Sequence, residues 1–153
     1  MAMTDPRTLY RESAVRGASP VQLVVMLYEQ IAEDLRRAVR AIDENRIEAR
    51  TNAINHALAV IGHLQNNLNH TAGGQVAQNL ERFYNVSRQT LLEAQFKGSK
   101  EILTAQMSLF LNLRDAWTEV DQAEAARSAL AAAPLHETGS APFDQEVHAD
   151  WKV

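Results

Sequence analysis

The chain has 153 residues, of which 46% are hydrophobic, and it carries a formal charge of −4 with no cysteine. This length suits one domain, and the lack of cysteine excludes a disulfide scaffold and thiolate metal sites. The acidic balance argues against a nucleic-acid partner, which would need a basic face, and no apolar run approaches the ~20 residues that span a bilayer. We therefore expect a soluble, cytoplasmic protein without membrane insertion.

The first predicted helix begins at Ser19 and Pro20 and ends near residues 43–45. A serine can accept a hydrogen bond from a free amide at a helix start, and proline suits the first helical position. Apolar residues repeat at steps of three and four, which predicts one face turned to a core. The main stripe is Val24, Tyr28, Ile31, Leu35, Ala38 and Ile42, and a second stripe beside it is Val21, Val25, Ala32 and Val39.

The second predicted helix runs from about Ile47 to Asn69 and ends before a turn at Gly73 and Gly74. Gly62 lies inside it, where glycine costs about 1 kcal/mol relative to alanine. One apolar line is Ile54, Leu58, Ile61 and Leu68, and its neighbour is Ala53, Ala57, Val60 and Leu64.

Two further helices follow, one from about Gln75 to Gln95 and one from Ser99 to about Ala132, with a turn at residues 97–99 between them. In the third helix the residues expected inward are Val76, Leu80, Phe83, Ser87, Leu91 and Ala94, with Tyr84 and Leu92 flanking them. In the fourth helix core spacing is shown by Leu103, Phe110, Leu113, Trp117 and Val120, and additional apolar positions are Ile102, Met107, Leu109 and Leu111.

Long helices joined by short turns predict an all-α fold, an antiparallel up-down four-helix bundle. We expect residues 1–18 to form an N-terminal apolar arm, residues 19–132 the bundle, and residues 133–153 a disordered acidic tail. The tail holds four acids and one lysine, a composition that disfavours a packed core.

Sites for chemistry are weak in this sequence. None of the five histidines has a glutamate three positions before it, so the ligand pair of di-iron bundles is missing. His56, His63 and His70 are spaced by seven, but neighbours on one helix would lie about 10.5 Å apart, too far to share an ion. We read them as a solvated face. No nucleophile motif or phosphate loop is present either, so we expect no cofactor, no metal and no enzymatic activity.

Three blocks of sequence resemble one known family. The first, residues 9–29, reads LYRESAVRGASPVQLVVMLYE. The second is a pair of glycines at 73–74 followed by NLERFY at 79–84, and the third is LRDAW at 113–117. Together they resemble the FliS family, the flagellar export chaperones for flagellin, over about residues 9–120. Glu29 stands where aspartate is usual in the family, and Gly17 where threonine is frequent.

The resemblance implies a cytoplasmic chaperone that binds the disordered C-terminal segment of flagellin, prevents premature polymerisation and helps delivery to the type III export gate. The arm would lie against the bundle and take part at the client surface, although it could instead be a simple hydrophobic staple on the first helix. Whether the client-free chain forms a homodimer is left open. The residues expected to contact the partner are Leu9, Tyr10, Val15, Val25, Met26, Leu27, Val60, Leu64, Leu109 and Leu111.

Two other classes compete with this interpretation. One is a four-helix interaction or scaffold module unrelated to flagella, for which spare apolar stripes would serve a different partner. The other is a cofactor-binding bundle enzyme, which the apolar stripes disfavour because they offer almost no ligands.

Overall fold

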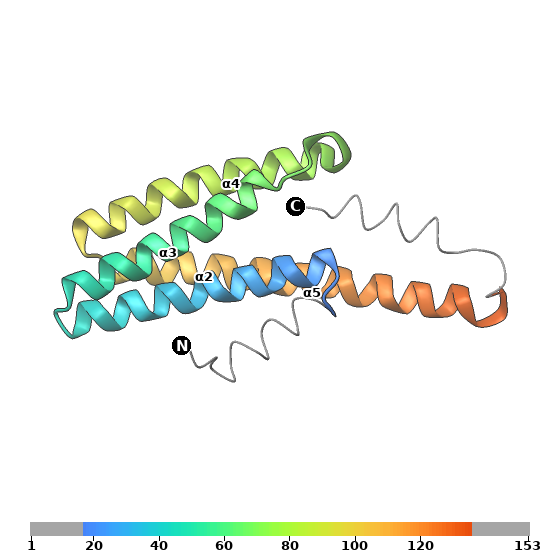
Figure 1. Cartoon of the computed structure of the whole chain (residues 1–153), viewed down its shortest axis with the longest axis horizontal. Coiled ribbons are helices and arrows are strands. Elements are labelled where there is room, and N and C mark those ends of the chain that lie inside the picture. The colour runs from blue at the N-terminus through green and yellow to red at the C-terminus, as the bar shows by residue number, and fades with distance from the viewer. Residues whose placement is uncertain (1–16, 136–153) are drawn as a thin grey trace, which may run out of the picture.

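The computed structural model describes residues 17–135, with side chains for residues 17–123, and this part of the chain contains four helices. They are α2 (Pro20–Asp43), α3 (Ile47–Asn66), α4 (His70–Lys97) and α5 (Lys100–Leu135). Consecutive helices run in opposite directions, and each packs against its neighbours in a ring (Figure 1). The predicted up-down bundle is confirmed. The predicted arm up to residue 16 and the predicted tail from residue 136 onward fall outside the described residues. Residues 133–135, which were assigned to the tail, are the last residues of α5.

The helix starts follow the sequence signals. Ser19 accepts a hydrogen bond from the amide of Gln22, and the Gln22 side chain accepts one from the Ser19 amide, which makes a capping box on α2. Gly98 adopts a left-handed conformation (φ 61°) after α4, and Ser99 accepts from the amide of Ile102 to begin α5. These caps fix the positions at which α2 and α5 begin.

The boundary between the second and third helices differs from the prediction. α3 ends at Asn66, and α4 begins at His70, where Asn69 accepts a hydrogen bond from the amide of Ala72. Gly74, at φ 51° and ψ −126°, then interrupts the regular helix. The prediction that three histidines share one helix face is therefore wrong for His70, which belongs to the next helix.

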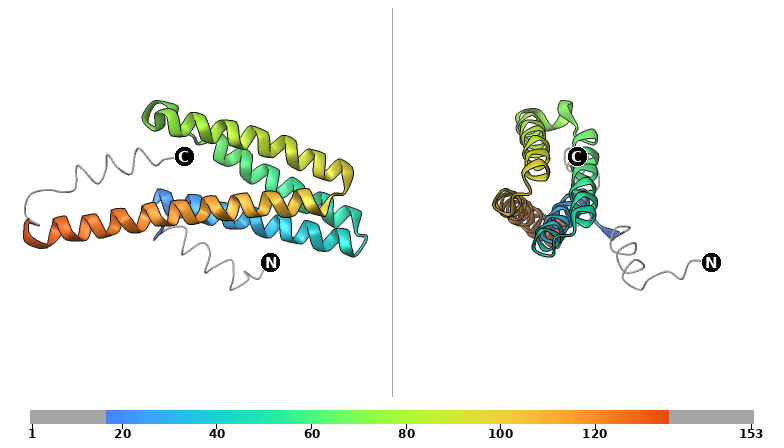
Figure 2. Two further views of the ribbon diagram at one scale, coloured as in Figure 1. Left: turned by 180° about the vertical axis from the view of Figure 1, so that it is seen from behind. Right: turned by 90° about the vertical axis from the view of Figure 1, so that its left-hand side faces the viewer.

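The core fills the space between the four helices. It contains most of the predicted stripe residues, with Tyr28, Ile31, Leu35, Ile54, Ile61, Leu91, Leu103 and Phe110 fully buried. Two expectations on the third helix were wrong: Tyr84, placed at the flank, is fully buried, and Val76, placed inward, is 54% exposed. Val76 lies just after the Gly74 interruption, at the end of α4 that stands away from α2 and α5 (Figures 1 and 2).

The bundle is uneven in shape. The turn between α3 and α4 stands well apart from α2 and α5, and α5 extends beyond the start of α2 (Figures 1 and 2). The end-on view in Figure 2 shows α4 opposite α2 across the ring. Among the described residues no helix is long and apolar enough to cross a membrane.

Candidate functional site

Two tyrosines meet in the middle of the bundle. The hydroxyls of Tyr28 on α2 and Tyr84 on α4 are 2.7 Å apart and form a buried hydrogen bond. Burial raises the pKa of both side chains; in Tyr28 the hydrogen bonds with Tyr84 and Trp117 partly offset this rise, whereas in Tyr84 the Tyr28 hydroxyl adds to it. Both hydroxyls therefore stay neutral and paired at physiological pH.

The aromatic residues around this pair complete a cluster. Tyr28 packs edge-on against Phe110 of α5 with ring centres 5.6 Å apart, and Phe83 packs against Phe110 at 5.1 Å. Edge-to-face pairs of this kind stabilise a core beyond simple burial. The cluster joins α2, α4 and α5.

The three sequence blocks singled out above converge at this cluster, although they are far apart along the chain. Tyr28 is the second-to-last residue of the first block, Tyr84 ends the second and Trp117 ends the third. At the surface nearby, Arg114 of the third block donates a hydrogen bond to Glu29 of the first block at 3.2 Å. The blocks are thus one structural unit that joins α2, α4 and α5.

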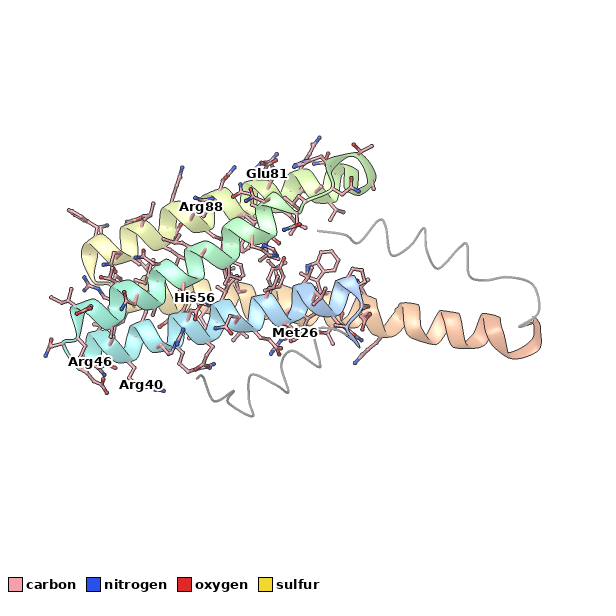
Figure 3. All side chains as sticks on the ribbon, viewed as in Figure 1. Met26, Arg40, Arg46, His56, Glu81 and Arg88 are labelled. Carbon is pink, nitrogen blue, oxygen red and sulfur yellow. The ribbon has the colours of Figure 1, made fainter. Side chains whose placement is uncertain are left out.

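The residues predicted to contact a partner lie in different environments. Leu9, Tyr10 and Val15 fall outside the described residues. On α2, Val25 and Leu27 are partly buried and packed against the core, as is Val60 on α3. Met26, labelled in Figure 3, is partly buried but does not belong to that packed set.

Three of the predicted positions do not fit one surface groove. Leu64 is only 1% exposed and belongs to the core, so it is not available at the surface in this conformation. Leu109 is 44% exposed and Leu111 is partly buried. Because residues two positions apart on a helix point about 200° apart, these two leucines flank opposite sides of α5.

Exposed apolar side chains gather on α4 instead. Of the large hydrophobic residues exposed in the described region, four belong to this helix: Val76, Val86, Leu92 and Phe96. Leu92 is 56% exposed and Phe96 is 90% exposed, and the four-residue spacing places them side by side on one helix face. The sequence analysis did not select Phe96, and its spacing from Leu92 is the signal that could have found it.

A comparison with known families shows to which family the chain belongs. The model of the family described as "Flagellar protein FliS" matches residues 3–124. The chain belongs to the FliS family. This match covers α2, α3, α4 and most of α5, together with nearly all of the predicted arm.

Relatives from several bacteria share the name flagellar secretion chaperone FliS. The protein from Salmonella typhimurium is 30% identical over 110 residues, which are 71% of this chain and 82% of the relative. The protein from Bacillus subtilis is 27% identical over 124 residues, 81% of this chain and 92% of the relative. The protein from Campylobacter jejuni is 30% identical over 115 residues, 75% and 90% respectively.

This FliS protein has a buried acid, Asp34, that the sequence pattern did not indicate. Asp34 on α2 is fully buried and accepts hydrogen bonds from Gln30 and Arg37 on its own helix. It also pairs with Nδ1 of His56 on α3 at 2.5 Å, so His56 is an inter-helix contact and not merely a solvated residue. Within residues 17–123, no group of three or more acids and histidines is placed to hold a metal ion.

Proposed function

We propose that this FliS protein is a cytoplasmic export chaperone for flagellin. It binds the disordered C-terminal segment of flagellin, prevents premature polymerisation and aids delivery to the flagellar type III export apparatus. The observation that carries the proposal is the family match over residues 3–124, which includes all three sequence blocks. The relatives' shared name, flagellar secretion chaperone, supports the same role.

The surface chemistry supports binding of an amphipathic client. A segment that forms helical contacts in a filament must carry an apolar face, and Leu92, Phe96 and Leu109 offer apolar area to receive one. Ordering a disordered segment offsets part of the contact energy, so the complex is specific and still releases its client. Such binding needs no catalytic group and no cofactor.

We also propose that the N-terminal arm occupies part of the client surface in the free protein. Leu9 and Tyr10 each contribute ~1.5–3 kcal/mol when fully buried, which is enough to compete with a reversible client. The capping box at Ser19 starts α2 independently of the arm, so the arm can leave without unwinding the helix. The client would then displace the arm as it binds.

A polymerisation assay tests the proposed function. Flagellin monomers are added to filament seeds with and without an equimolar amount of this protein, and filament growth is followed by light scattering. We expect the protein to suppress growth, because it covers the segment that forms filament contacts. Filament growth at the same rate with and without a large excess of the protein would contradict the chaperone role and favour an unrelated interaction module.

A further inference from the structure

A hollow of about 500 Å³ lies where the end of α2 meets the start of α3, away from the aromatic cluster. Its floor is made of small side chains, of which Ala41 and Ala53 are buried. Figure 3 shows Arg40 and Arg46 at this end of the bundle, with His56 farther along α3. The lining residues are Arg37, Arg40, Ala41, Glu44, Arg46, Ala49, Asn52, Ala53 and His56.

The rim of this hollow is cationic although the whole chain carries −4. Three arginines face one acid, Glu44. Arg37 is already paired with the buried Asp34, and Arg46 lies 3.6 Å from Glu44 while both side chains remain exposed. Arg40 makes no ion pair within the described residues, so its charge is available to a ligand, and Arg46 would exchange its exposed contact with Glu44 for one with the ligand.

The start of α3 adds hydrogen-bond donors on the same side. Its first residue follows Arg46, whose side chain makes no capping hydrogen bond. The amides of the first helical turn therefore have no side-chain acceptor, and Ala49 from this turn lines the hollow. Free amides and the positive end of a helix favour a negatively charged group, although Glu48 in the first turn of α3 already supplies one negative charge there.

We propose that this hollow binds an acidic peptide segment of another protein. The lining runs from Arg37 to Glu44 on α2 and from Arg46 to His56 on α3, which is roughly 10–15 Å along the helices. That length suits about four residues of extended peptide and exceeds a single phosphate. Carboxylates bind Arg40 and Arg46, and a small apolar side chain packs on the alanine floor.

Fluorescence anisotropy with a labelled peptide tests the proposal on the full-length protein. The probe has glutamates on both sides of an alanine, and its twin has glutamines in their place. We expect the glutamate peptide to bind at low salt, and Arg40→Glu or Arg46→Glu to weaken binding about tenfold each. Arg88→Glu on α4 makes the same change of charge at a distant exposed site and should change binding less than about twofold.

Four results would overturn the proposal. They are no binding at low salt, equal binding of the glutamine twin, an Arg88→Glu effect as large as that of Arg40→Glu, and displacement of the peptide by tripolyphosphate that itself binds more tightly. Neutralising the tail with Asp144→Asn, Glu146→Gln and Asp150→Asn should leave the affinity within about twofold. A larger gain would identify the tail as the occupant and is a fifth result that would overturn the proposal. Circular dichroism confirms that each variant is folded.

Discussion

Tyr28 and Tyr84 place two hydroxyl groups in the apolar centre of the bundle, where an unpaired hydroxyl costs about 1–3 kcal/mol. Each satisfies the other at 2.7 Å, and Trp117 contributes a further hydrogen bond to Tyr28. The pair joins α2 to α4, which packs less closely against the other helices. It therefore stabilises the bundle and fixes the register of α4.

The raised pKa values of these tyrosines predict an alkaline limit to stability. Because the folded state favours the neutral form, its contribution is complete below the ordinary tyrosine pKa of 10.0 and is lost as the pH rises above it. In a Tyr10→Phe variant, Tyr28 and Tyr84 are the only tyrosines. Tyrosinate absorbance should then appear above pH 10.0 only together with loss of helical circular dichroism. Titration near pH 10.0 with intact helices would show that the two hydroxyls are accessible.

Gly62 offers a test of local helix energetics. A Cβ atom built there would meet only Nη1 of Arg88, at 3.9 Å, an ordinary contact. Gly62→Ala should therefore raise the free energy of unfolding by about 0.5–1 kcal/mol, measured by urea denaturation. Gly98→Ala is the matched control, and it should destabilise because Gly98 has φ 61° and a Cβ there would lie 2.9 Å from Arg50. A loss of stability in Gly62→Ala would contradict this geometry.

At the scale of helices, α4 carries apolar residues on two faces. Its inner face packs Leu80, Tyr84 and Leu91 into the core, and its outer face exposes Leu92 and Phe96. Apolar side chains as exposed as these contribute little to the free energy of folding, so Leu92 and Phe96 are available to contact a client.

Substitution of the outer pair separates binding from stability. Leu92→Ser with Phe96→Ser should change the free energy of unfolding by less than about 1 kcal/mol and weaken binding of a flagellin C-terminal segment about tenfold or more. Gln78→Ser, at an exposed polar position about 21 Å from Leu92 along the same helix, is the control and should leave affinity unchanged. Client affinity that stays within twofold in the double variant would remove α4 from the client surface.

Most helix positions could be predicted from sequence because their caps and periodic stripes are local signals. Ser19, Pro20, Gly98 and Ser99 marked boundaries that the structure confirms. The α3–α4 boundary was placed too late, because the pair Gly73–Gly74 looked like the turn, whereas Asn69 already caps α4 and Gly74 interrupts that helix from within. Its position depends on how the two helices pack.

The candidate surface was harder to predict than the fold. Leu64 and Leu109 look alike as secondary-stripe leucines, and only packing buries one and exposes the other. Asp34 was not recognised because a buried carboxylate depends on a partner from another helix, here His56. Contacts between distant residues leave no periodic signal in a single sequence.

For the whole molecule, the arm and the bundle are expected to act together. Leu9→Ala with Tyr10→Ala should tighten client binding, by about tenfold for each ~1.4 kcal/mol of arm contact removed, because the client no longer displaces the arm. Calorimetry with the client segment measures the change. Weaker binding would identify the arm as a clamp over the bound client, and a change below twofold with lower thermal stability would identify a staple on α2.

Isothermal titration calorimetry with a synthetic flagellin C-terminal segment tests the central claim most directly. We expect saturable heat with a stoichiometry near one segment per chain, because one bundle presents one client surface. Coupled ordering of the segment should give a favourable enthalpy opposed by entropy. The absence of heat and of saturation, with protein that circular dichroism shows to be folded, would contradict the assignment of this FliS protein as a flagellin chaperone.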